Sequence, residues 1–187
     1  MNHKGTKKLE TNRLILRKYE SKDVEDMFHN WVNDSEVMKY LTWKAHGSIE
    51  VTREINLLDI SKYDCLDYYK WVIILKSSKE AIGGINVAKV DESCSSVEVA
   101  YRLGKAWWNK GIASEALSRV IEFLFEEVGV NRIAAMHDTN NASSGLVMKK
   151  CGMSYEGTLR QAGLNNQGIY DIACYSILYD EYIKMLS

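Results

Sequence analysis

A short turn that leads from a predicted strand into a predicted helix carries the residues best suited to bind an anion. It spans Gly104 to Ser114 and has the sequence GKAWWNKGIAS. The first amides of a helix have no hydrogen-bond acceptor within it, and the positive end of the helix dipole lies among them. Gly111 lets a phosphate approach the backbone, Ala113 keeps the next turn uncrowded and Lys110 adds positive charge. The turn therefore predicts a phosphate-binding site.

Two other phosphate-binding patterns do not fit this turn. Gly104 is followed by Asn109-Lys110, so the second glycine of G-x-x-x-x-G-K-[ST] is missing, and no segment reads G-x-G-x-x-G. Neither an ATP loop nor a dinucleotide fingerprint is supported. Taken alone, the turn is about equally compatible with a helix entrance that binds no ligand.

Composition limits the other functions that this chain could have. With 187 residues, 46% of them hydrophobic, we expect a single domain over residues 1–187, of which residues 1–10 form a disordered leader. Lys and Arg number 24 against 25 Asp and Glu, so the formal net charge of −1 gives no general attraction to nucleic acid or to an anionic membrane. No apolar run is long enough to span a bilayer. We expect neither a nucleic acid nor a membrane as partner.

The four cysteines indicate reduced thiols rather than a metal site. Cys65, Cys94, Cys151 and Cys174 form no C-x-x-C pair and have no histidine at metal-ligand spacing. The sequence therefore predicts no metal and a cytoplasmic location. Cys151 could form a covalent acetyl-enzyme, but it stands among apolar neighbours without an adjacent histidine, and buried thiols are commonly inert.

The first half of the chain is predicted to contain a strand, two helices and a hairpin. The strand covers residues 13–17. One helix is capped by Ser21 or Asp23 and carries apolar residues as far as Trp31, and Ser48 opens a second helix. Two apolar segments, 69–75 and 81–87, flank a polar turn and predict a β-hairpin.

The second half alternates strands with helices. In residues 96–103 an apolar face alternates with a face that carries Glu98, Ala100 and Arg102, so a strand is predicted. A helix over 113–128 ends at Gly129. The remaining predicted elements are strands over 131–137, 153–158 and 170–178 and a helix over 142–150. The whole pattern predicts a mixed α/β fold, with a largely antiparallel central sheet flanked by helices and open where the halves meet.

Several segments, in the same order along the chain, resemble the GNAT superfamily of N-acetyltransferases. Residues 11–17 (TNRLILR) resemble its opening strand, and residues 97–103 (VEVAYRL) with 108–116 (WNKGIASEA) resemble its central strand and acetyl-coenzyme A loop. Residues 141–153 (NASSGLVMKKCGM) resemble its N-x-x-S-x-x-x-x-x-K-x-G-[FM] helix, and residues 155–160 (YEGTLR) its next strand. Each segment is weak alone, but the ordered set is specific.

The resemblance extends from about Thr11 to Tyr182, nearly the whole chain. Within the superfamily, the N-R-L-x-L-R opening and the E-G-x-L-R segment are similar to the Rim-type branch, which acetylates the N-terminal alanine or serine of ribosomal proteins. That branch has a tryptophan and Gly-Lys-Gly where this sequence has Trp108 and Asn109-Lys110-Gly111. Asn109 departs from the pattern, although Asn tolerates left-handed backbone angles better than most residues.

The resemblance implies acetyl-CoA as cofactor, CoA as product and a specific binding site. The strands that carry Glu98 and His137 are expected to splay apart, so that the pantetheine arm lies between them against free backbone groups. The turn and the resemblance together predict the following cofactor-binding residues: Tyr101, Arg102, Leu103, Trp108, Asn109, Lys110, Gly111, Ile112, Ala113, Ser114, Asn141 and Ser144.

Two side chains are predicted to be catalytic on the same resemblance. Glu98 corresponds to a proposed general base, although an isolated carboxylate on a strand is often only solvated. The tyrosine that protonates the leaving thiolate in many GNAT enzymes corresponds to Met148, which has no proton to donate. Ser144, one turn earlier, matches a serine proposed for that role in the Rim-type branch; it could instead bond its own helix backbone, with water as the proton donor.

The acceptor amine is left open by the sequence. An α-amine has a pKa of about 7.7 to 8.0 and a lysine about 10.4, so a modest base is better suited to a protein N-terminus. The alternatives are a small amine, such as a polyamine, amino acid or antibiotic, and a module that binds acyl-CoA without catalysis. Trp107 and the final strand near Tyr175 offer surfaces for a possible homodimer.

Overall fold

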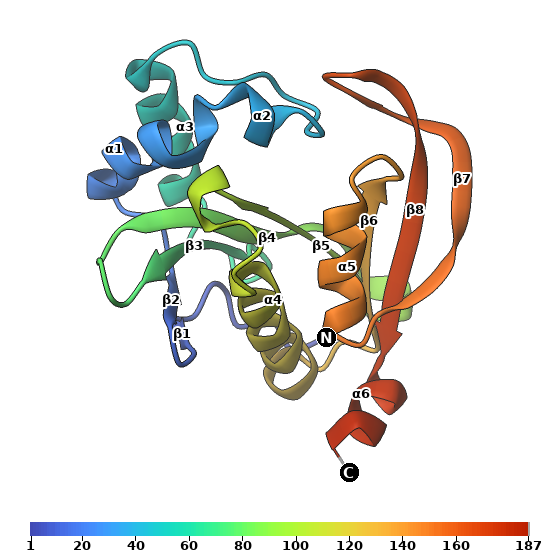
Figure 1. Ribbon diagram of the computed structural model, residues 1–187. Coiled ribbons are helices and arrows are strands. Elements are labelled where there is room, and N and C mark those ends of the chain that lie inside the picture. Colours follow the sequence, from blue (N-terminus) through green and yellow to red (C-terminus); the bar gives the residue numbers. More distant parts are fainter. Residues whose placement is uncertain (187) are drawn as a thin grey trace.

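The computed structural model describes residues 1–186, which form an eight-stranded sheet with helices on both faces (Figure 1). The strand order is β1-β2-β3-β4-β5-β6-β8-β7. Every neighbouring pair is antiparallel except β5 and β6, which are parallel. The mixed, largely antiparallel α/β fold predicted from the sequence is confirmed.

The strands are β1 (Leu9–Glu10), β2 (Leu14–Arg17), β3 (Lys70–Leu75), β4 (Ala81–Asp91), β5 (Ser96–Leu103), β6 (Arg132–Asp138), β7 (Ser154–Asn165) and β8 (Gly168–Leu178). The α-helices are α1 (Val24–Met27), α2 (Ser35–Met38), α3 (Ile49–Ser61), α4 (Ile112–Phe123), α5 (Ala142–Lys150) and α6 (Tyr179–Leu186). Short 3₁₀ turns are η1 (Ser21–Asp23), η3 (Glu92–Cys94) and η4 (Lys105–Trp107), and π-helical turns are η2 (Phe28–Val32) and η5 (Leu124–Val128).

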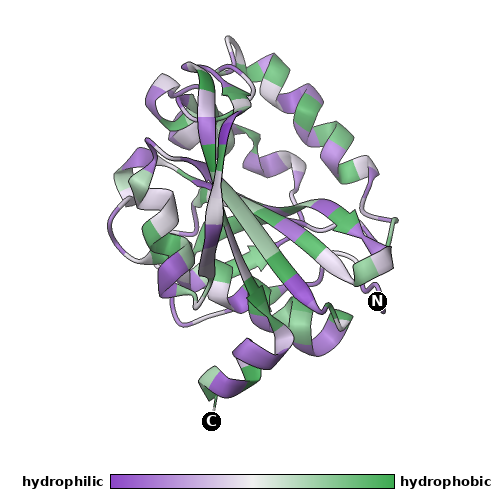
Figure 2. Cartoon of the chain, turned by 90° about the vertical axis from the view of Figure 1, so that its right-hand side faces the viewer, coloured by the Kyte–Doolittle hydropathy of each residue, from purple (hydrophilic) through white to green (hydrophobic). Residues whose placement is uncertain are grey.

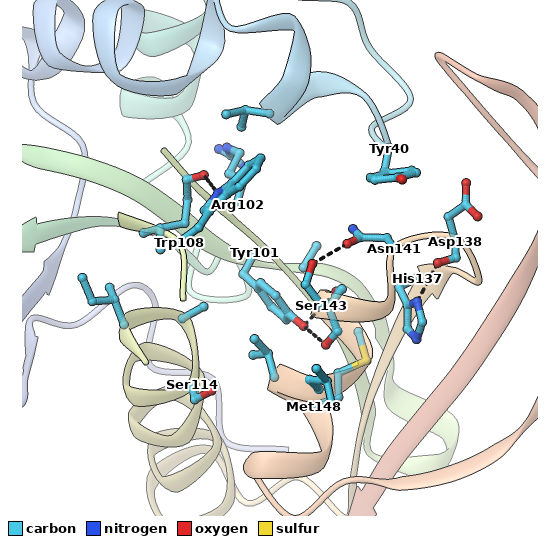
Figure 3. A pocket seen from close by; sticks show the side chains of 18 of the residues that line it. Tyr40, Tyr101, Arg102, Trp108, Ser114, His137, Asp138, Asn141, Ser143 and Met148 are labelled. Atoms are coloured by element: carbon cyan, nitrogen blue, oxygen red, sulfur yellow. Dashed lines mark hydrogen bonds between the residues drawn. The ribbon is translucent and has the colours of Figure 1, made fainter. Parts of the chain in front are cut away.

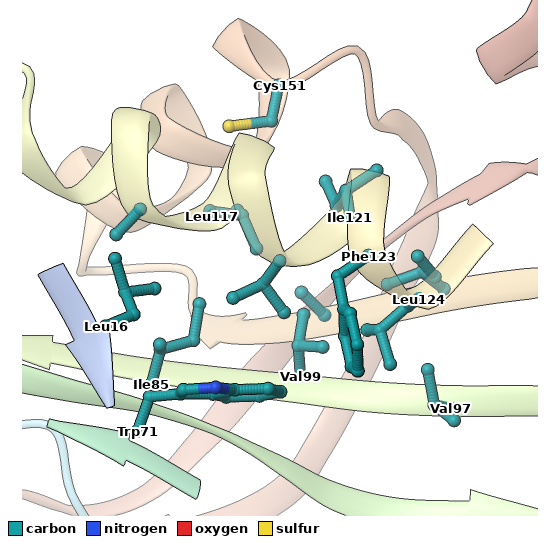
Figure 4. Packing of buried hydrophobic residues seen from close by; sticks show 14 of the residues in the cluster. Leu16, Trp71, Ile85, Val97, Val99, Leu117, Ile121, Phe123, Leu124 and Cys151 are labelled. Atoms are coloured by element: carbon teal, nitrogen blue, oxygen red, sulfur yellow. The ribbon is translucent and has the colours of Figure 1, made fainter. Parts of the chain in front are cut away.

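The hydrophobic core lies mainly between the sheet and α4. On this face Trp71, Val99 and Phe123 are buried side by side, as Figure 4 shows. A smaller cluster lies on the opposite face beneath α1 and η2, where Trp31 and Val72 are buried. Successive residues of β2 and β3 contribute to alternate clusters, because side chains on a strand alternate between its faces.

Helix α4 has the apolar stripe that its sequence predicts. Leu117, Val120 and Ile121 are buried against the sheet. The helix predicted over 113–128 is confirmed in extent, but its last turn widens into the π-helical η5. Gly129 ends it with φ of 75°, a left-handed conformation that glycine adopts at no steric cost. The long helix therefore holds a rigid position over the centre of the sheet.

Helix α3 is oriented the opposite way to the simple amphipathic packing that its sequence suggests. Its buried residues are Thr52, Asn56 and Asp59, all polar, whereas Ile55 and Leu58 are exposed. In Figure 2, α3 is the long helix at the upper right, and hydrophobic and hydrophilic segments alternate along it. The polar side of α3 faces the molecule because buried polar partners lie beneath it, among them Lys70, which pairs with Asp59.

Strands β5 and β6 are joined only at their beginnings. Residues 96–98 of β5 pair with residues 132–134 of β6, and the register records no later pair. Beyond this point β5 continues to Leu103 along β4, and β6 continues to Asp138 along β8. The two strands therefore separate over their second halves, as the resemblance implied, and a gap opens at their carboxyl ends.

Several elements differ from the sequence-based expectation. Residues 1–10 were expected to form a disordered leader, but Leu9 is buried in β1, and the amide of Asn2 donates to the carbonyl of Val128 (2.8 Å). The first helical segment is divided into η1, α1 and η2, and Asp23 accepts the amide of Glu20 rather than capping by a bond of its own to the helix. Helices α2 and α6 were not predicted, and β7 extends seven residues past its predicted end at Thr158.

Candidate active site

A cavity of about 480 Å³ lies where β5 and β6 separate, between the start of α4 and helix α5 (Figure 3). Residues 99–103 of β5, residues 136–138 of β6 and the turn into α4 form much of its wall. Tyr40, Leu41 and Tyr170 line it as well. In a sheet whose parallel strands part, the space beyond their carboxyl ends is the usual place for a ligand.

The turn into α4 presents backbone amides to this cavity. Asn109 and Gly111 both adopt left-handed conformations, with φ of 59° and 72°. Asparagine tolerates this region better than most residues, so the departure from the family's first glycine leaves the turn intact. The bond from the amide of Glu115 to the carbonyl of Gly111 (3.1 Å) begins the helical ladder, and the amides just before it have no acceptor in the helix. This end of α4 therefore fits a diphosphate.

An ion pair between Arg13, near the N-terminus, and Glu115 of α4 holds the turn in place. Nε of Arg13 lies 2.6 Å from Oε2 of Glu115, and Nη1 of Arg13 donates to the carbonyl of Lys110 (2.9 Å). Thr11 and the amide of Arg13 also donate to Glu115. Arg13, at the start of the predicted first strand, thus positions the phosphate turn together with Glu115, a role that the sequence analysis did not assign to either residue.

Of the predicted cofactor-binding residues, all but Lys110 line the cavity. Trp108, one of these residues, donates from its indole Nε1 to the carbonyl of Leu103 (2.7 Å) and is 39% exposed. That carbonyl was expected to be free for a ligand, and it already has one donor. Trp108 thus ties the end of β5 to the turn.

A tyrosine and a serine meet on the α5 side of the cavity. The hydroxyl of Tyr101 donates to the carbonyl of Ser144 (2.8 Å) and lies 2.9 Å from its Oγ. Burial raises the pKa of Tyr101 well above its ordinary value, so this hydroxyl stays protonated at neutral pH. Met148 is buried on the same helix, one turn further along. Ser144 therefore faces the cavity with a protonated phenol as its neighbour.

Asn141 stands at the start of α5 and makes no side-chain cap there. Its Oδ1 accepts the hydroxyl of Ser143 (2.8 Å), while its side chain lines the cavity. The side-chain amide remains directed at the cavity side of the helix, where it can donate to a ligand.

Glu98 does not line the cavity. It is half-buried on the other face of β5, opposite Lys89 of β4 and Ala134 of β6, at the last paired position before the strands part. Burial raises the pKa of Tyr170, and the charges of Asp138 and Glu98 raise it further. Tyr170 itself lines the cavity. The negative charge of Glu98 therefore influences a cavity residue, although Glu98 lies on the face of β5 opposite α4.

Three cavity residues on β6 were not singled out in advance: Met136, His137 and Asp138. Nδ1 of His137 donates to the carbonyl of Asp138 (2.7 Å), and its Nε2 is buried without a partner among residues 1–186. A Cβ at Gly145 would lie 2.6 Å from that nitrogen, so the glycine lets α5 approach β6. Their place at the end of a parallel strand was the signal that could have identified them.

Cys151 is unsuited to covalent chemistry. It is 5% exposed, and burial raises the pKa of its thiol. Within residues 1–186, no cluster of His, Cys, Asp and Glu side chains could hold a metal ion, and no helix has the length and hydropathy to cross a membrane. The groups at the cavity that remain for chemistry include backbone amides, hydroxyls, a carboxylate and the imidazole of His137.

Comparison with known proteins agrees with this geometry. Residues 13–154 match the acetyltransferase (GNAT) domain family. The chain is 34% identical over 170 residues to the uncharacterized N-acetyltransferase YoaA of Bacillus subtilis, covering 91% of this chain and 96% of that protein. It is 27% identical over 113 residues to the ribosomal-protein-serine acetyltransferase of Escherichia coli, covering 60% of this chain and 63% of that protein.

A solved structure shares the fold. RimL, a ribosomal L7/L12 α-N-protein acetyltransferase in complex with coenzyme A, superposes with a TM-score of 0.83, covering 94% of this chain and 99% of that chain at 18% identity. The separated strands, the turn into α4 and the match over residues 13–154 lead to one conclusion. The chain belongs to the GNAT family of acetyltransferases, enzymes that take their acetyl group from acetyl-CoA.

Proposed function

We propose that this enzyme acetylates the α-amine of a protein N-terminus by direct transfer from acetyl-CoA. The observation that carries the proposal is the separation of β5 and β6 after three paired positions, directly beside the open amides of α4. Such a gap is accessible from both faces of the sheet, so a cofactor on the α4 face and an amine on the other face can meet within it. No covalent enzyme intermediate is needed.

The residues that would hold the cofactor belong to two adjoining segments. Backbone amides at residues 109–114 would bind its diphosphate, and backbone groups at residues 101–103 with the side chain of Asn141 would bind its pantetheine arm. Acetyl-CoA supplies an activated acetyl thioester. The chain's own task is to deliver a neutral amine, to stabilise negative charge on the thioester oxygen through a backbone amide and to return a proton to the sulfur.

Glu98 is the proposed general base. Its carboxylate stands on the acceptor face at the position where the gap begins, and it could take the proton of the ammonium directly or through water. An α-amine with a pKa of about 7.7 to 8.0 is already partly neutral at pH 7. A carboxylate at the edge of the gap is therefore a sufficient base for an N-terminal amine.

Ser144 is the proposed donor of a proton to the departing thiolate. Met148 cannot fill this role, and the Oγ of Ser144 lies at the cavity in contact with the phenol of Tyr101. If the serine proton is passed to the sulfur, the neighbouring phenol can in turn donate to the serine oxygen, because its raised pKa keeps it protonated. The Ser144→Ala variant tests this assignment: a wild-type rate of thiol release would transfer the role to water.

The choice of a protein N-terminus is supported by the relatives. The Escherichia coli relative is named a ribosomal-protein-serine acetyltransferase, and RimL is named an α-N-protein acetyltransferase. We infer a cytoplasmic location as well, since all four cysteines are free.

The deciding experiment measures thiol release from acetyl-CoA with three groups of acceptors. They are peptides that begin with Ser or Ala, the same peptides with a blocked N-terminus and one internal lysine, and small amines including polyamines and aminoglycosides. We expect turnover with the free N-termini, located by mass spectrometry on the α-nitrogen. Turnover only with small amines would replace the proposal, and tight CoA binding without turnover of any amine would indicate a binding module.

A further inference from the structure

A second cavity, of about 350 Å³, lies on the face of the sheet opposite α4. Helix α3, the segment after α2 and strand β3 enclose it, with Asp59, His46 and Lys70 among its lining residues. Arg102 lines both this cavity and the larger one beside α4. The two cavities therefore share a wall at the point where β5 has left β6.

The carboxylate in this cavity, that of Asp59, is already paired with a positive charge. Asp59 lies 2.6 Å from the ammonium of Lys70 and accepts the hydroxyl of Tyr68 (2.8 Å). Asp59 is 6% exposed, so the ion pair is held out of solvent. Because each charge of the pair is matched by the other, neither leaves a net charge in the cavity.

His46 adds no positive charge. It is 8% exposed, and its Nδ1 lies 2.8 Å from the hydroxyl of Thr52. Burial lowers the pKa of its imidazole, and the nearby charge of Arg102 lowers it further. At neutral pH the ring is uncharged. Besides Lys70, the cationic side chains that line this cavity are the exposed Lys44 at the rim and Arg102.

Arg102 carries a charge that no carboxylate balances among residues 1–186. Its Nη1 donates to Oδ1 of Asn86 at 3.3 Å and its Nη2 donates to the hydroxyl of Tyr19 at 3.4 Å, both long bonds to neutral groups. Its Nε is buried and has no partner in the described chain. Its guanidinium carbon lies 6.0 Å from the ring of Trp43, which stabilises a cation but offers no counter-charge.

The fold makes room for this guanidinium. Gly84 of β4 faces it, and a Cβ there would overlap with the hydroxyl of Tyr19 and lie 3.4 Å from Nη2 of Arg102. The positive field is felt by the neighbours, because desolvation and the charge of Arg102 together lower the pKa of Lys70. A half-buried guanidinium with an unused donor and no carboxylate is a site for an anion of matching geometry.

We propose that the second cavity binds a carboxylate of the acceptor, with Arg102 as its anchor, while the acceptor's amine reaches the gap between β5 and β6. This inference rests on the proposed acetyltransferase function and narrows its substrate class to amines that carry a nearby carboxylate. Two sources have this chemistry: an acidic side chain close to a peptide's N-terminus, and the carboxylate of a small amino acid.

The test uses acceptors in pairs in which a carboxylate is replaced by the corresponding amide, and each rate is compared at the same concentration of neutral amine. One pair consists of peptides that begin with Ser and carry Asp or Asn at the second or third residue, and the other consists of serine and serine amide. We expect kcat/KM to be about ten- to hundredfold higher for the charged member of at least one pair, as for a hydrogen bond to a charged group. The pair that responds identifies the source of the carboxylate.

Variants then show whether Arg102 causes the preference. Arg102→Met should bring the charged-to-neutral ratio of kcat/KM close to one, and Arg102→Lys should keep part of it, because the charge remains while the fork of donors is lost. Arg53→Met, on the exposed side of α3, is the matched control and should keep the wild-type ratio. Thermal unfolding of each variant checks that its fold is retained.

The outcomes separate this inference from the function on which it rests. Turnover of peptides, with no preference for the charged member in either pair, overturns the carboxylate site and leaves the proposed function standing. Turnover of serine over its amide, without peptide turnover, keeps the site and removes the N-terminal function. If no amine is acetylated, the binding of both pairs of acceptors to the CoA-loaded protein is measured by calorimetric titration. Equal affinities for the two members of each pair would then contradict the carboxylate site.

Discussion

Helices α3 and α4 cover opposite faces of one sheet, and they bury opposite kinds of residue. Helix α4 places Leu117, Val120 and Ile121 against the strands, whereas α3 turns Thr52 and Asp59 inward and leaves its leucines in solvent. The two helices therefore contribute differently to the molecule. Helix α4 supplies most of the apolar burial and begins at the turn that we propose for the cofactor, and α3 borders the polar cavity that we propose for the acceptor.

We expect the largest change in activity from the variant of Glu98, the proposed general base. Replacing Glu98 by Gln should lower kcat/KM by about a hundred- to ten-thousandfold, because a positioned base contributes that much to proton transfer. Binding of CoA, measured by calorimetry, should be unchanged, since Glu98 lies outside the larger cavity. Glu54→Gln on the exposed side of α3 is the control. Wild-type kcat/KM across pH for the Glu98 variant would remove this residue from the mechanism.

The inward polar side of α3 should be as necessary to stability as an apolar one. Asp59→Ala leaves the ammonium of Lys70 buried without its partner, so we expect unfolding free energy to fall by about 3–5 kcal/mol. Asp64→Ala, at an exposed position just after the helix, should change it by less than about 0.5 kcal/mol. Urea unfolding of both variants measures the difference. Equal midpoints would show that the polar side of α3 contributes nothing to stability.

Two leucines test the same difference between α3 and α4. Leu117 of α4 is fully buried and Leu58 of α3 is 60% exposed. Leu117→Ala should cost about 2–5 kcal/mol through lost burial and the cavity left behind. Leu58→Ala should cost less than about 0.5 kcal/mol. The contrast disappears if Leu58 is covered by a second copy of the chain, in which case Leu58→Ala would instead shift the oligomeric state in sedimentation experiments.

The smallest effect is expected at the entrance of α4. Arg13→Ala removes the ion pair to Glu115 and the bond to the carbonyl of Lys110. The Kd for CoA should rise about threefold to tenfold, because a partly exposed pair contributes on the order of 1 kcal/mol and about 1.4 kcal/mol is tenfold. Stability should change little. Arg53→Ala serves as control, and an unaltered Kd for the Arg13 variant would mean that the turn holds its shape alone.

Periodicity predicted the α4 side well and the α3 side poorly. The apolar spacing of α4 and the alternation in β5 are local patterns, and Val97 and Val99 are buried as that alternation requires. In α3 the apolar spacing points to the wrong face, because the partners of its polar side lie outside the helix, on β3 and in the segment around His46, and periodicity within the helix does not reveal them.

The active site was predictable only in part. The turn into α4 could be identified from residue types, since its glycine and its position after a strand carry the information. The clamp by Arg13 and the contact of Tyr101 with Ser144 could not, because each joins residues more than forty positions apart. The shared wall at Arg102 depends on where two strands part, which no local pattern encodes.

The three paired positions between β5 and β6 also bear on how the molecule resists disruption. They are the only backbone ladder between strands β1–β5 and the unit of β6, β8 and β7, as far as residues 1–186 are concerned. The sheet thus has a seam near its middle, where amide protons should exchange through local opening sooner than those of β3 and β4. A cofactor bound against both β5 and β6 would link the two parts of the sheet. Bound CoA should therefore slow amide exchange most strongly in these two strands.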